Sequence, residues 1–563
     1  MASKWLKCIM IPLSVVSLAT ATACGGSSDP AQTETSDVST PITISFFGSD
    51  ANPTWNNMKD DVGQAITKAT NVTINAEYDV SGGGTQKIAL MTASGEYPDT
   101  IFPKGSITKL VEAGALIDLT DLINKYGPNI KKVYGNDLSR LQYSKEDPSI
   151  YVLPTNAGVG ETKFDAGGGF EIQHQVMKEL GYPKIKTVKD FENVLKEYKA
   201  KHPTINGQPT IPLTLNADDW KIMITVTNPA FLATGAPDDG EFYINPETYQ
   251  AELHYKRPEE KEYFRWLNHM YNEGLLDPET FTQKNDQYLS KIASGRVLGL
   301  IDQDWDYQQA ENSLKTSGMP ERTYGHYPLQ LDDSTKDRSF QDIGPPVGYG
   351  IGITTSAKDP IRIIKFLDWM ASDEAQVLNN WGIEGKHYEV KDGKRVIPQA
   401  IQDRKINDNT NFTKESGIGM YYFSVHYGDG VKDSGGNYYT TNFPEQILAS
   451  YTQPEKDALK AYGATTWKDL FPPKEDFPIK AWGAAYNLPS PDDPSYTVAY
   501  QKSQDIVRKR VPEAILAKPD QFDGIYDQMV AELNTDEMKK MEASYSELIK
   551  NTVELWSKSS TTK

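Results

Sequence analysis

Cysteine is nearly absent from this sequence, and its scarcity limits how the chain can be stabilised. Only Cys8 and Cys24 occur among 563 residues. Both stand in the first 24 residues, so no disulfide can form within the rest of the chain. Stability must therefore come from large hydrophobic cores rather than from covalent cross-links. Because one core rarely serves more than about 250–300 residues, we expect two or more lobes.

Basic residues and clustered histidines are also scarce. The chain has 58 lysines and arginines against 77 acidic residues, a net charge of -19 at pH 7, and this balance argues against nucleic acid as a partner. The seven histidines lie far apart without an H-E-x-x-H pair, so we expect no zinc site. The sequence also lacks a G-x-S-x-G nucleophile motif. These absences predict a protein that is not an enzyme and has no cofactor or metal.

Long apolar runs are missing except at the start of the chain. Lys4 and Lys7 precede an apolar stretch, residues 8–18, that is too short to span a bilayer and is typical of an export signal. No later stretch approaches the length of a membrane span. We therefore predict a signal peptide over residues 1–23. Its removal shifts the charge to -21, because residues 1–23 carry two lysines and no acids.

The cysteine that follows this segment suggests an anchor. Ala21, Thr22 and Ala23 precede Cys24 and resemble the lipobox of bacterial lipoproteins, in which the cysteine is acylated and becomes the new N-terminus. Ala21 stands where that motif usually has leucine, and the three residues also fit ordinary A-x-A cleavage. We favour acylation of Cys24, because it accounts for an otherwise unpaired thiol. Two acyl chains suffice for stable anchoring. Residues 24–40, small and polar, then form a disordered tether.

The stretch from residue 41 alternates between strand and helix patterns. Ile42, Ile44 and Phe46 alternate with polar residues, as in a strand. A helix over about 55–70, a strand in NVTINAEYDV, a helix around 86–94 and a strand around Thr100 follow. This order predicts an α/β fold with helices on both faces of a sheet. Ligands settle at the carboxyl ends of such strands, where we expect the loops at 48–52 and 103–106.

Several motifs in order resemble extracellular family 1 solute-binding proteins, the receptors of carbohydrate ABC importers. They are SFFGSDANP, ASGEYPDTIFPKG, VEAGALIDLTDLINKYGPN, YVLPTNAG, QVMKELGYPKIKTVKDFENVLKEY, KIASGRVLGLIDQDW and GYGIGITTSAKDPIRIIKFLDWMASDEAQVLNNWGIEGKHYEV. They span roughly residues 41 to 390. The remainder resembles the extended C-terminal region of large lipoprotein members from Gram-positive bacteria.

The resemblance implies a type II periplasmic-binding-protein-like fold, with two α/β lobes joined by a hinge around a ligand cleft. The N-terminal lobe would comprise residues 41–154 plus about 345–390. The C-terminal lobe would comprise 155–344 plus much of 391–563, with crossings near 154–158 and 344–350. The implied function is reversible binding of an oligosaccharide and its delivery to a permease. The receptor would be a monomer anchored on the outer face of the cytoplasmic membrane. A structural calcium ion is conceivable but unsupported.

IDQDWDY, residues 301–307, is the most informative short stretch. On a strand, Asp302, Asp304 and Asp306 would share one face. Their spacing suggests calcium but lacks the glycine and glutamate of an EF-hand loop, so a strand end with turn acids is the preferred interpretation. Trp305 is a candidate for stacking on a sugar ring, with Asp304 and Gln303 as hydrogen-bonding neighbours.

Further ligand-binding candidates depend on the family resemblance. The aromatic candidates are Trp220, Tyr349 and Trp381, and the polar candidates are Asp50, Asn52, Lys104 and Asn156. For each aromatic residue, a role in the core is an equally good interpretation. Trp266 and Trp369 lie inside helical patterns, so we expect them to be packing residues.

Two other functional classes stay open at this stage. The first is an anchored carbohydrate-active enzyme. Neighbouring acids such as Asp218 with Asp219, and Asp238 with Asp239, could be offered as its catalytic pair, but we expect them to form solvated faces. The second is a receptor for peptides or another nutrient, or a sensor that presents its ligand to a signalling protein.

Overall fold

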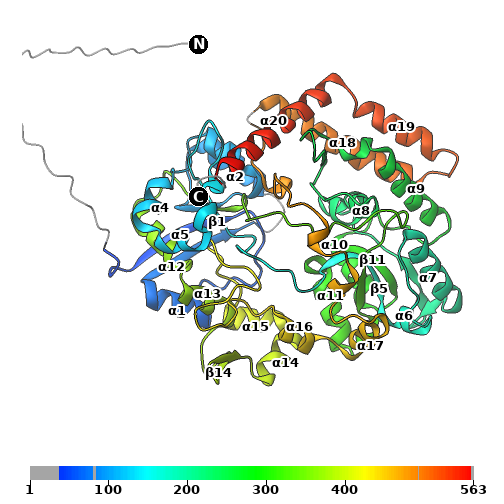
Figure 1. The fold of residues 1–563 in the computed structure, drawn as a ribbon, viewed down its shortest axis with the longest axis horizontal. Coiled ribbons are helices and arrows are strands. Elements are labelled where there is room, and N and C mark those ends of the chain that lie inside the picture. The colour runs from blue at the N-terminus through cyan, green and yellow to red at the C-terminus, as the bar shows by residue number, and fades with distance from the viewer. Residues whose placement is uncertain (1–36, 80–83, 492, 560–563) are drawn as a thin grey trace, which may run out of the picture. The chain divides into compact units, whose positions relative to one another are not determined.

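The computed structural model describes residues 37–79, 84–491 and 493–559, which form a mixed α/β structure (Figure 1). The predicted signal peptide, Cys24 and the tether up to residue 36 lie outside the described residues. Among the helices of the described ranges, none is both long enough and apolar enough to cross a bilayer.

The first sheet has five strands in the order β2-β1-β3-β13-β4. Strands β1, β2 and β3 are parallel, and β13 runs antiparallel to β3 and β4. The predicted strands are confirmed. The bounds are β1 (Ile42–Gly48), β2 (Val72–Tyr78), β3 (Thr100–Phe102), β4 (Leu153–Pro154) and β13 (Gly350–Ile353).

Helices cover both faces of this sheet, as the alternating pattern predicts. Ile44 and Phe46 point into one core and Phe47 into another, because successive side chains of a strand face opposite ways. The helices around the sheet are α1 (Asp61–Thr70), α2 (Gly84–Ser94), α3 (Ile107–Glu112), α4 (Thr120–Tyr126), α5 (Pro128–Tyr134), α12 (Pro360–Met370) and α13 (Asp373–Trp381).

Helix α1 begins six residues later than the predicted start at Trp55. Asn57 and Met58 adopt left-handed backbone angles, with φ of 62° and 58°, which a continuous helix cannot contain. The Asp60 side chain then caps the helix by accepting a hydrogen bond from the Gly63 backbone N–H at 2.7 Å. Short-range side-chain capping therefore sets the boundary.

The second sheet has four strands in the order β12-β5-β11-β8. They are β5 (Gly168–Gln173), β8 (Ile211–Leu213), β11 (Val297–Gln303) and β12 (Tyr324–Tyr327). The helices of this lobe are α6 (His174–Glu179), α7 (Val188–Lys201), α8 (Pro229–Ala233), α9 (Pro258–Asn272), α10 (Asn285–Ala293) and α11 (Asp304–Thr316). Two small ladders join β6 (Thr204–Ile205) to β7 (Gln208–Pro209) and β9 (Phe242–Ile244) to β10 (Ala251–Leu253).

Local predictions for this lobe are confirmed in one place and wrong in another. Thr187 and Asp190 form the predicted cap of α7, as a full capping box. Residues 301–307 are not one strand, because β11 ends at Gln303 and α11 begins at Asp304. The face-sharing predicted for Asp302, Asp304 and Asp306 is therefore wrong.

The chain after residue 390 contributes to both cores. Tyr421 and Phe423 join the core of the first sheet, Trp467 and Tyr526 join that of the second, and Trp556 returns to the first. The elements are β14 (Glu389–Lys391), β15 (Lys394–Val396), α14 (Gln399–Asn407), α15 (Asn409–Ser416), α16 (Pro444–Ser450), α17 (Gln453–Tyr462), α18 (Pro494–Leu516), α19 (Phe522–Glu532) and α20 (Asp536–Ser559).

The segments that run between the two cores lie against one another. The Thr155 N–H donates to the Tyr349 carbonyl at 3.2 Å, and Val159 N–H donates to the His426 carbonyl at 2.8 Å. Gly348 has φ 81°, and a Cβ there would lie 1.9 Å from the Asn487 carbonyl oxygen. A glycine is required here for this close approach of backbone to backbone.

Candidate functional site

Two tryptophans with large exposed surfaces lie face to face in the second lobe. The rings of Trp220 and Trp305 are stacked, with centroids 6.0 Å apart and planes 17° from parallel. They are 41% and 58% exposed, whereas most tryptophans of the described chain are buried. Trp305 is the second residue of α11, directly after β11, and Trp220 follows the loop after β8. The ends of two neighbouring strands thus present one aromatic surface.

A lysine from the other lobe faces this pair. Lys104, which follows β3, lies with Nζ 5.9 Å from the ring centroid of Trp220 and 2.6 Å from Oδ1 of Asp50. Lys104 and Asp219 have left-handed φ angles of 50° and 53°. Such backbone angles cost free energy in residues other than glycine and cluster at functional sites. Lys104, Asp50, Trp220 and Trp305, with Asp304 and Tyr349, are called the inter-lobe site below.

The acids of IDQDWDY diverge rather than converge on a cation. Burial raises the pKa of Asp302 to about 6, and its Oδ2 accepts from the Tyr288 hydroxyl at 2.6 Å. Asp306 pairs with Lys221 instead. Asp304 accepts from the Tyr307 hydroxyl at 2.7 Å, and its side chain is 41% exposed beside Trp305. Asp304 is therefore the member of this series placed to meet a ligand.

Tyr349 extends the inter-lobe site along the crossing segments. Its hydroxyl donates to the Tyr486 carbonyl at 3.0 Å, and burial together with the charge of Asp50 raises its pKa. Tyr486 is 50% exposed, yet burial and the charges of nearby acids, Asp238 first, raise its pKa. Tyr349 therefore connects the inter-lobe site, through the nearby charge of Asp50, to Tyr486.

Comparison with known families decides what kind of protein carries this site. The model of the family described as bacterial extracellular solute-binding protein matches residues 61–380. The chain belongs to this family. Its structure also has the two-lobed fold of solute-binding proteins, type II periplasmic-binding-protein-like.

Individual relatives of this solute-binding protein agree with that assignment. Lipoprotein LipO of Bacillus subtilis is 24% identical over 448 residues, which cover 76% of this chain and 80% of LipO. The fructooligosaccharide ABC transporter substrate-binding protein FusA of Streptococcus pneumoniae is 24% identical and aligns with 53% of this chain and 55% of its own length. The solved structure of the alginate-binding protein AlgQ2 matches with a TM-score of 0.62 at 17% identity, covering 91% of this chain and 98% of AlgQ2.

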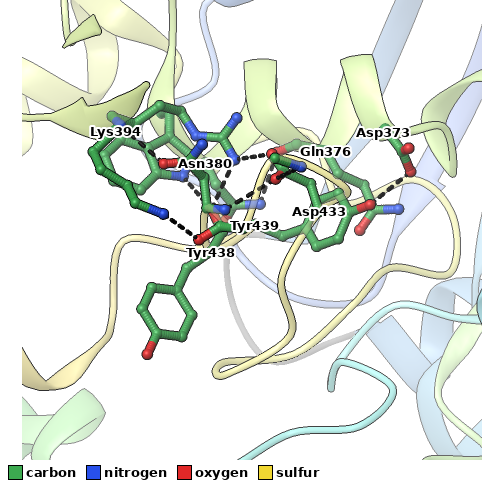
Figure 2. A network of polar contacts seen from close by, with 12 residues as sticks. Asp373, Gln376, Asn380, Lys394, Asp433, Tyr438 and Tyr439 are labelled. Carbon is green, nitrogen blue, oxygen red and sulfur yellow. Dashed lines mark hydrogen bonds and ion pairs between the residues drawn. The ribbon is translucent and has the colours of Figure 1, made fainter. Parts of the chain in front are cut away.

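One predicted binding residue of the solute-binding protein lies in a structural network instead. Trp381, the last residue of α13, is 3% exposed, stacks on Phe443 and donates from Nε1 to the Tyr438 carbonyl at 3.0 Å. Figure 2 shows the surrounding contacts, in which the Tyr439 hydroxyl donates to Asp373 at 2.8 Å. The structure does not bring Trp381 to the inter-lobe site, because its ring packs against Phe443, Tyr388 and Arg395 and its N–H is used in a hydrogen bond.

The other predicted residues differ in how free they are to meet a ligand. Gln303 ends β11 and is half-buried, with its side chain packed over Gly168. Asn52 accepts from the Thr54 hydroxyl at 2.9 Å within the first-lobe loop. Asn156 is exposed on the crossing segment. Of these three residues, Gln303 is the one close in sequence to the tryptophan pair, because it precedes Trp305 by two positions.

Sequence reasoning missed Tyr486 and Glu161. The Tyr486 carbonyl accepts from the Tyr349 hydroxyl, and the charges of Glu161 and of Asp238, an acid expected on a solvated face, act on Tyr486. Burial raises the pKa of Asp238 to about 6 although its side chain is accessible. For Asp239 the expected solvated face is wrong. Its side chain is buried against Lys480 and accepts a hydrogen bond from Trp482 Nε1 at 3.1 Å. No local pattern marks Glu161 and Asp238, since these residues come from segments far apart in the chain. For Tyr486 the available signal is the number of tyrosines and tryptophans after residue 420.

One group in the described ranges could hold a metal ion, and the sequence did not suggest it. Glu171, Asp304 and His326 each offer a ligand atom within 4.8 Å of the others. Two of them are buried, and Asp304 also belongs to the inter-lobe site.

Proposed function

We propose that this solute-binding protein is the receptor of an ABC importer, which binds an oligosaccharide between its lobes and delivers it to the permease. The observation that carries the proposal is the exposed, stacked pair Trp220 and Trp305, with Lys104 of the other lobe opposite. A sugar ring has apolar C–H faces that pack on indole, and hydroxyl groups at its edge that need hydrogen-bond partners. Aromatic surface with a few polar groups is a common design of small-ligand sites.

The polar groups of the site suit hydroxyl recognition. Asp50 and Asp304 are accessible carboxylates on opposite lobes, and a carboxylate accepts hydrogen bonds from adjacent hydroxyls. Because the two acids belong to different lobes, a ligand that contacts both would favour the closed arrangement over an open one. Closure would mark the loaded receptor for the permease.

Relatives support the ligand class and the anchor. FusA is named for fructooligosaccharides, and solved structures with this fold include binding proteins named for alginate and for N-glycans. LipO is named a lipoprotein. We infer that Cys24 of this chain is acylated, and that a monomeric receptor is held on the outer face of the cytoplasmic membrane.

A ligand screen tests the proposal. Purified protein is mixed with oligosaccharides of different sugars, linkages and lengths, and the melting temperature is measured along with the reaction products. A raised melting temperature with intact sugar supports the receptor. Shortened products would establish the enzyme instead. Stabilisation by peptides, with no effect of any sugar, would identify a different nutrient receptor.

A further inference from the structure

Three polar side chains, two from strands of the second sheet and one from the start of α11, converge beside Trp305. Glu171 of β5 and His326 of β12 are directly opposed in their antiparallel register. Asp304 follows β11, which pairs with the other edge of β5. The sheet therefore fixes the relative positions of all three, although Glu171 and His326 stand far apart in the sequence. One ligand atom of each lies within 4.8 Å of those of the other two.

Glu171 is buried without a hydrogen-bond donor. Its exposure is 0%, and neither carboxylate oxygen has a hydrogen-bond partner in the described part of the chain. The facing Nδ1 of His326 lacks a hydrogen bond as well. A buried carboxylate without donors is costly. A positive charge next to Glu171, from a metal ion or from a proton on His326, would offset this cost.

Glu171 and the nitrogen of His326 that faces it are farther apart than a hydrogen bond, at the spacing of two ligands of one metal ion. Nδ1 of His326 lies 3.4 Å from Oε1 of Glu171, whereas Asp304 lies nearer the other ring nitrogen, with Oδ1 3.6 Å from Nε2. Direct N–H···O bonds measure about 2.7–3.2 Å. Ligand atoms held about 2.0–2.2 Å from a tetrahedral zinc ion are about 3.3–3.6 Å apart.

We propose that Glu171, Asp304 and His326 bind one divalent transition-metal ion, through one oxygen of each carboxylate and one imidazole nitrogen. Imidazole with carboxylate suits Zn²⁺ or Mn²⁺, whereas Ca²⁺ and Mg²⁺ prefer oxygen ligands only. Asp304 is 41% exposed beside Trp305, so a coordination position opens towards the inter-lobe site. A ligand hydroxyl pair or acidic group can take that position. The metal site goes beyond the proposed function and can be tested without any sugar.

The test titrates metal-free protein with Zn²⁺, and separately with Mn²⁺, by calorimetry, with metal content measured after dialysis. We expect one ion per chain at micromolar affinity or tighter, and a melting temperature that rises with the metal and falls back with EDTA. Glu171→Gln and His326→Asn should each weaken binding by more than the roughly 10–100-fold that loss of an outer-shell partner costs. His202→Asn is the control, because it removes an exposed histidine that pairs with Glu179, and it should leave affinity unchanged.

Glu171→Gln also separates loss of metal from loss of folding. This change removes a buried charge that no donor satisfies, so the metal-free variant should melt at or above the wild-type temperature. Absence of stoichiometric binding of either metal would overturn the proposal, and so would wild-type affinity in Glu171→Gln. In that case a proton on His326 supplies the charge instead. Metal binding without sugar binding would refute the proposed function alone.

Discussion

Replacing Trp305 with alanine should weaken ligand binding without destabilising the free protein. Trp305 is 58% exposed, which for a side chain of about 250 Å² leaves about 145 Å² in contact with solvent. A sugar ring stacked on one face would cover about half of this area, about 70 Å². At about 25 cal/mol per Å², the lost burial is about 1.8 kcal/mol. The dissociation constant should therefore rise about 20-fold.

Calorimetry with the best oligosaccharide of the screen measures this change, and thermal unfolding of the ligand-free variant checks its fold. Val498→Ala on α18 is a matched control, since Val498 is 62% exposed and lies outside the inter-lobe site as defined. It should leave affinity unchanged. Trp305→Phe should fall between wild type and alanine, because it keeps a smaller ring. If Trp305→Ala binds the ligand as tightly as wild type, the stacking argument fails.

Three further changes test other parts of the structure. Gly348→Ala should lower the free energy of unfolding by more than the roughly 1 kcal/mol that backbone incompatibility costs, because the new Cβ would meet the Asn487 carbonyl. Gly463→Ala is the control, because Gly463 has φ 73° but open space around it, and it should cost less in the same urea titration. Burial lowers the pKa of His174 to about 3. Below about pH 6.5 the unfolded chain therefore binds more protons than the folded chain, and the free energy of unfolding decreases as the pH is lowered. His174→Phe should remove about 2 kcal/mol of the stability difference between pH 7 and pH 5, and equal slopes of stability against pH in wild type and variant would contradict this. Cys24→Ser should shift the protein from the membrane to the soluble fraction, and a free thiol at Cys24 in the mass spectrum of the wild type would rule out the lipid anchor.

Local patterns in the sequence predicted most elements of the first lobe correctly. The alternation of Ile42, Ile44 and Phe46 fixed β1, and Thr187 with Asp190 fixed the start of α7. Predictions failed where a few backbone angles decided the outcome. The late start of α1 depends on the left-handed Asn57, and a strand pattern can run on into a helix, as at Asp304. Periodicity does not report such switches.

The sequence by itself determined the α/β class and the aromatic residues available for binding. These follow from composition, hydrophobic period and short motifs, which act within a few residues. Only the tertiary structure decided which aromatics face a ligand and which are packed: Trp305 is exposed, while Trp381 is enclosed by segments more than 50 residues away. It alone brought Glu171 opposite His326, because strand pairing joins residues whose separation along the chain carries no signal.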